Sequence, residues 1–86
     1  MIENLSIEEV KEFADPEALS WDGFEDAILG VDTNGRLVYD IDKMAQICVE
    51  RDKMDIDEAM EYLEFNYFCA YIGELTPLHI RILRRV

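Results

Sequence analysis

The sequence predicts an α+β domain in which a small antiparallel sheet packs with about three helices, in the order α-β-β-α-α-β. Asn34-Gly35 lies between two segments rich in β-forming residues, and this is the strongest short signal for a hairpin. Two segments carry Ser or Asp three residues before Glu, the capping box that begins a helix. Residues 78–82 alternate apolar and polar side chains, as a half-buried strand does.

The length and composition predict a single domain over residues 1–86. Hydrophobic residues make up 50% of the chain, so it is not an acidic disordered tail. A chain of this size buries only a small core, and we expect a stability of about 5 kcal/mol.

The first helix is predicted over 6–14. Ser6 caps it and Glu9 reaches back to the cap, while the apolar residues that follow recur at helical spacing. Asp15-Pro16 then begins a further helical turn, with Asp as the cap and Pro in the first turn.

The hairpin is predicted over 26–40, with strands at about 26–32 and 36–40. Gly30 inside the first strand indicates a bulge or a close approach by another segment. A C-terminal strand at about 78–83 would complete the antiparallel sheet.

Two helices are predicted between the hairpin and the last strand. Asp40 or Asp42 caps a helix over 41–52, and Asp55 begins another that runs from 56 to 72 and ends at Gly73. The second half of that helix, 65–72, is apolar nearly all round, which is typical of a central helix or an interface.

The charge of the chain is strongly negative and uneven. Eight Lys and Arg stand against 20 Asp and Glu, a formal net charge of −12, and the last twelve residues hold three bases and no acid. Such a chain repels nucleic acid and anionic membranes and attracts basic partners. We therefore expect neither direct nucleic-acid binding nor membrane binding.

The chain shows no secretory signal and no apolar run long enough to span a membrane, which favours a cytoplasmic protein. Cys48 and Cys69 lack metal-ligand spacing, and we expect both to be buried, reduced thiols. A disulfide between them is the less favoured alternative.

Residues 32–35 contain two oxygen ligands at the spacing of a calcium loop, but the first and last ligands of such a loop are replaced by Gly30 and Ile41. A hairpin turn is the better interpretation. His79, the one histidine, has no accompanying nucleophile motif, and apolar neighbours of the cysteines keep a Cys–His pair unreactive. The chain has no phosphate-binding loop and no metal-spaced cluster, so we expect no enzyme, no catalytic residue, no metal and no cofactor.

Acidic and aromatic residues are the candidates for contact with a partner protein. Aromatic side chains often dominate binding energy, although Trp21 and Phe24 are better interpreted as closing the edge of the core. The candidates are Glu8, Glu9, Glu12, Trp21, Asp22, Phe24, Glu25, Tyr67 and Tyr71.

Several short motifs, weak singly and distinctive in combination, resemble a family of small uncharacterised proteins of bacteriophages, prophages and bacterial genomes. They are Phe24-Glu25-Asp26-Ala27-Ile28-Leu29-Gly30, Val38-Tyr39-Asp40, Lys43-Met44, Glu58-Ala59-Met60-Glu61-Tyr62, Phe65-Asn66, Ala70-Tyr71-Ile72-Gly73 and Thr76-Pro77. The resemblance covers about 24–80; Lys53 departs from it, because the family has Gly there. It implies a phage-derived accessory protein that binds host machinery, and it transfers no activity.

The favoured hypothesis is a non-enzymatic accessory protein that binds a host or bacterial protein with a basic face. Its carboxylates would replace phosphates, as in DNA mimics and anti-defence inhibitors, including anti-CRISPR proteins. One alternative is a self-assembling protein, such as a homodimer, that pairs through the apolar helix 65–72. A second alternative is a regulator that binds a small ligand or a metal.

Overall fold

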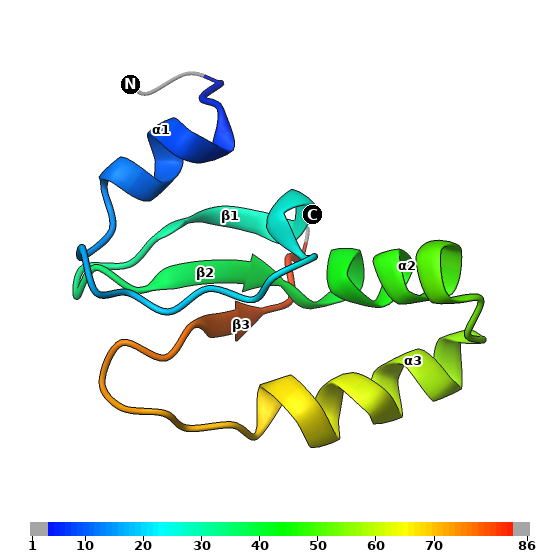
Figure 1. The fold of residues 1–86 in the computed structure, drawn as a ribbon. Coiled ribbons are helices and arrows are strands. Elements are labelled where there is room, and N and C mark those ends of the chain that lie inside the picture. The colour runs from blue at the N-terminus through cyan, green and yellow to red at the C-terminus, as the bar shows by residue number, and fades with distance from the viewer. Residues whose placement is uncertain (1–3, 84–86) are drawn as a thin grey trace.

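The computed structural model describes residues 4–83 (Figure 1). It confirms the predicted fold class and element order. The helices and strands are α1 (Ile7–Glu12), β1 (Ile28–Val31), β2 (Leu37–Asp40), α2 (Ile41–Asp52), α3 (Ile56–Leu63) and β3 (Leu78–Ile80). A short 3₁₀ turn, η1 (Glu25–Ala27), precedes β1, and a π-helical turn, η2 (Glu64–Phe68), extends α3.

The three strands form one sheet in the order β1-β2-β3, and it is mixed rather than antiparallel. β1 and β2 pair antiparallel, as the hairpin signal predicts, whereas β3 runs parallel to β2. The antiparallel prediction for the last strand was wrong because α2 and α3 lie between the two strands. α3 packs back along α2, and residues 69–77 then return the chain to the starting end of β2 (Figure 1).

The hairpin turn is closed by the side chain of Asp32. Its carboxylate accepts hydrogen bonds from the backbone N–H of Asn34 (2.9 Å) and of Arg36 (2.8 Å). Gly35 has a φ of +86°, and a side chain there would lie 2.8 Å from the Asp15 nitrogen, so the position requires glycine. The segment is a hairpin turn, as predicted, and β1 carries the predicted irregularity, between Ile28 and Gly30.

Side-chain caps define where the helices begin. Ser6 and Asp55 each form a complete capping box, and the Asp40 carboxylate accepts from the N–H groups of Asp42 and Lys43 at the start of α2. Lys53 caps the C-terminal end of α2 in the left-handed conformation (φ 59°), which favours glycine.

The predicted helix over 56–72 is shorter in the structure. The α-helix ends at Leu63, continues as η2 to Phe68, and then gives way to a turn in which Gly73 has a φ of +115°. The side-chain amide of Asn66 donates to the Tyr62 carbonyl (2.8 Å), and Phe68 packs against His79 instead of following a helix face. Among residues 4–83, no helix is long and apolar enough to cross a membrane.

The core lies on one face of the sheet. Leu37, Tyr39 and His79 point to this face. Residues 14–24 cross it on the way to η1 (Figure 1). The fully buried side chains of the core are Phe24, Ala27, Leu37, Tyr39, Met44, Ala45, Cys48, Ala59 and Leu63.

The two cysteines occupy different environments. Cys48 is buried in the core, as predicted, but Cys69 is exposed, because it follows η2 where the chain leaves the helix. Both are free thiols, so they form no disulfide with each other.

Candidate functional site

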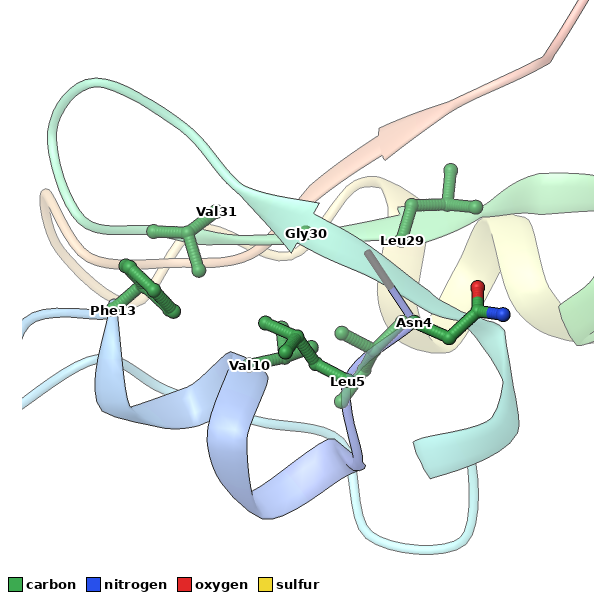
Figure 2. A pocket seen from close by; sticks show the side chains of 8 residues that line it. Asn4, Leu5, Val10, Phe13, Leu29, Gly30 and Val31 are labelled. Atoms are coloured by element: carbon green, nitrogen blue, oxygen red, sulfur yellow. The ribbon is translucent and has the colours of Figure 1, made fainter. Parts of the chain in front are cut away.

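A hollow lined mostly by apolar side chains lies between α1 and β1. Leu5, Val10 and Phe13 point from the α1 segment toward β1, and Figure 2 shows the space between them. The hollow has a volume of about 520 Å³. Its lining residues are Asn4, Leu5, Val10, Phe13, Ile28, Leu29, Gly30 and Val31.

A second hollow, of about 420 Å³, continues along the same helix and is partly acidic. Leu5, Glu9, Glu12 and Phe13 line it. Leu5 and Phe13 are shared by both hollows, so carboxylates and exposed apolar surface meet here. We call the two hollows together the acidic groove.

The apolar side of the acidic groove is accessible. Phe13 is 60% exposed, and a side chain added at Gly30 would meet no atom within 4 Å. A six-residue helix has too few positions to seal its apolar side chains against the sheet. Val10 and Phe13, which recur at the helical spacing seen in the sequence, both line the groove.

Glu9, on the acidic side of the groove, stays charged at neutral pH. The backbone N–H of Ser6 donates to the Glu9 carboxylate at 3.0 Å, and this bond, together with the Ser6 side chain, lowers the pKa of Glu9. Glu8, Glu9 and Glu12 are all exposed on α1. Three of the predicted partner-binding residues therefore share one short helix, two of them inside the groove.

Phe24, one of the candidates for contact with a partner, is a core residue. It is only 1% exposed, its ring packs edge-on against Tyr67 (5.2 Å between centroids), and the Arg51 guanidinium lies over it at 5.0 Å. Arg51 also donates to the Gly23 carbonyl at 2.9 Å. These contacts bury Phe24 in the core, which is the interpretation that the sequence favoured for this residue.

Trp21 is held by two hydrogen bonds at the same face of the sheet. Its backbone N–H donates to the Tyr39 hydroxyl, and its Nε1–H donates to His79 Nε2, both at 2.9 Å. Burial lowers the pKa of His79 and so favours the neutral imidazole that can accept this bond. Trp21 therefore closes the core edge, the interpretation that the sequence favoured.

The remaining predicted residues are separate from the acidic groove. Asp22 is exposed, and the half-buried Glu25 accepts from the Gly23 N–H at 3.1 Å. Tyr67 packs against Trp21 (5.1 Å between centroids), and burial raises its pKa to about 12. Tyr71 is 76% exposed and lies beyond η2, so it does not share a helix face with Tyr67.

Groups that perform chemistry do not gather in the part of the chain that the structure describes. No three His, Cys, Asp or Glu side chains among residues 4–83 are placed to hold a metal ion. Burial raises the pKa of the Cys48 thiol, which keeps it protonated, and His79 Nε2 is engaged by Trp21. The acidic groove is the arrangement best suited to a ligand, and its chemistry is that of binding.

Comparison with protein-family models, with curated proteins and with solved structures finds no match to this chain.

Proposed function

We propose that this protein is a non-enzymatic binding protein that takes a basic segment of a partner protein into the acidic groove. The proposal rests on one observation: apolar and acidic side chains line the same hollow. Leu5 and Phe13 offer apolar contact, and Glu9 and Glu12 stand beside them with charge to attract Lys or Arg.

The rest of the molecule supports a basic partner. The net charge of −12 steers positively charged surfaces toward the protein and repels nucleic acid. A protein that binds nucleic acid has a basic face built for phosphates, and carboxylates can take the place of these phosphates. Together with the family resemblance, this favours a phage-derived inhibitor of a host nucleic-acid-binding or defence protein.

The test uses a synthetic peptide that alternates Lys and Leu as the probe. We expect calorimetry to detect binding that weakens as salt rises, because ions screen the carboxylates. Replacing Glu8, Glu9 and Glu12 together by Gln should lower the affinity by at least about tenfold. Gln at position 9 preserves the capping box, so α1 should stay folded.

The matched control removes the same number of charges elsewhere. Asp57→Asn, Glu61→Gln and Glu64→Gln change three exposed acids of α3 and η2, and this variant should retain most of the affinity. Equal losses in the two triple variants would show that only net charge matters, and the acidic groove would no longer be the proposed site. Retention of host proteins from a bacterial lysate, by the wild type and not by the α1 variant, would then identify partners.

A further inference from the structure

The face of the sheet opposite the core carries partly exposed aliphatic side chains. Pairing in the sheet places Gly30, Val38 and Leu78 side by side, and Ile80 beside Asp40, on the face away from Tyr39 and His79. Val38 and Leu78 are half-buried, and Ile80 is 43% exposed. We call Val38, Leu78 and Ile80 the open face.

Exposed apolar side chains continue from the open face at both sides. Ile82, which follows β3, is 54% exposed. Leu78 also lines a hollow of about 370 Å³ together with Ile41 and Tyr71, and Tyr71 is 76% exposed. Contiguous apolar surface of this kind marks a site of protein contact more often than isolated exposed residues do.

Two ion pairs lie beside the open face. Arg36 is paired with Asp32 (2.8 Å), and Arg81 with Asp42 (3.3 Å). Asp40 is used as the cap of α2. Two of the eight Lys and Arg residues of this acidic chain thus lie beside the open face, each paired with a carboxylate.

We propose that the open face is the interface between two copies of this chain. Two molecules that each carry a charge of −12 repel one another, so we expect them to associate where ion pairs limit the local repulsion and apolar contact compensates for it. The open face meets both conditions. A two-fold axis would bring each copy's Val38, Leu78 and Ile80 against the same residues of the other copy.

Charge also argues against a foreign partner at this face. A basic protein is drawn to the acid-rich α1, and the arginines of the open face already have carboxylate partners, so they offer little to an acidic protein. This inference does not depend on the proposed function, because the interface and the acidic groove use different residues.

Sedimentation velocity over a range of protein concentrations tests the proposal. The wild type should reach twice the 10.1 kDa of one chain, and its dimer dissociation constant should fall as salt rises, because salt screens the repulsion between copies. Ile80→Lys should raise that constant by at least about tenfold. The new side chain would stand beside Asp40 of its own chain, so the monomer should keep its fold.

Phe65→Ser is the matched control. Phe65 is 81% exposed on η2, outside the open face, so the substitution should leave the dissociation constant unchanged. A dimer that Phe65→Ser dissociates and Ile80→Lys does not would place the interface on the segment 65–72 and overturn the proposal. A wild type that remains a monomer at its highest soluble concentration would overturn it as well, and a circular dichroism spectrum of each variant confirms folding.

Discussion

The two faces of the sheet differ sharply, although their residues alternate along the same strands. On the core face Leu37 is 2% exposed and Tyr39 is fully buried. On the open face their neighbour Val38 is only half-buried, and Ile80 is 43% exposed. The sheet is thus sealed on one side and accessible on the other.

The core face is sealed because it offers polar partners as well as apolar surface. The Tyr39 hydroxyl and His79 Nε2 both accept hydrogen bonds from Trp21, and these bonds fix residues 14–24 across the face. Val38, Leu78 and Ile80 have aliphatic side chains, which cannot fix a crossing segment in this way. Successive residues of a strand point to opposite faces of the sheet. Neighbouring residues therefore belong either to the face that their own chain covers or to the face that stays accessible.

The largest expected difference between the faces is in stability. Leu37→Ala should lower the free energy of unfolding by about 2–4 kcal/mol, because it leaves a cavity in the core. Val38→Ala should lower it by less than about 1 kcal/mol when urea unfolding is measured at low protein concentration, where the monomer dominates. Equal losses would show that the two faces are packed alike. A loss for Val38→Ala that grows with protein concentration would add support for the dimer.

A smaller effect is expected from the hydroxyl group of Tyr39. Tyr39→Phe leaves the Trp21 N–H without its acceptor in a part-buried place, which should cost about 1–2 kcal/mol of unfolding free energy. Tyr71→Phe removes the same hydroxyl from a side chain that is 76% exposed and should change stability by less than about 0.5 kcal/mol. If both variants are equally stable, the Tyr39 hydroxyl does not help to fix residues 14–24.

The smallest effect is a dependence of the core face on pH. Burial lowers the pKa of His79 in the folded protein, so its stabilising contribution is complete above the ordinary pKa of about 6.5 and declines as the pH falls toward the folded value. The groups around the imidazole, Trp21, Tyr39 and Phe68, do not titrate in this range. We therefore expect the urea midpoint to fall from pH 7.5 to pH 5 more in the wild type than in His79→Gln.

Trp21 is the one tryptophan of the chain, so its fluorescence reports directly on the core face. In the wild type the emission should change over the same pH range, because a protonated His79 can no longer accept from Nε1. Identical pH profiles for the wild type and His79→Gln would mean that the Trp21–His79 bond does not couple folding to pH.

Features fixed by local chemistry could be predicted from the sequence. The capping residues Ser6, Asp40 and Asp55 and the Asn34-Gly35 turn act within a few residues, and each lies where its pattern placed it. The direction of β3 could not be predicted from its alternation of apolar and polar residues, because this alternation is the same in parallel and antiparallel strands.

The candidate site was predictable only in part. The acids of α1 were found from charge, but the groove beside them depends on how a six-residue helix meets an edge strand. Phe24 and Tyr67 belong to the core because residues distant in sequence, Arg51 and Trp21, pack on them. Hydrophobic periodicity alone does not show whether an apolar side chain is covered by residues distant in sequence or is exposed.

The direct junction between β2 and α2 limits where the chain can accept an inserted residue. Asp40 is both the last residue of the strand and the cap of the helix, so no loop separates the two elements. One inserted residue at this point would rotate α2 by about 100° relative to the sheet and turn Met44 and Cys48 away from the core. Insertions should therefore be rejected there and accepted at the exposed Glu74, which lies in a turn.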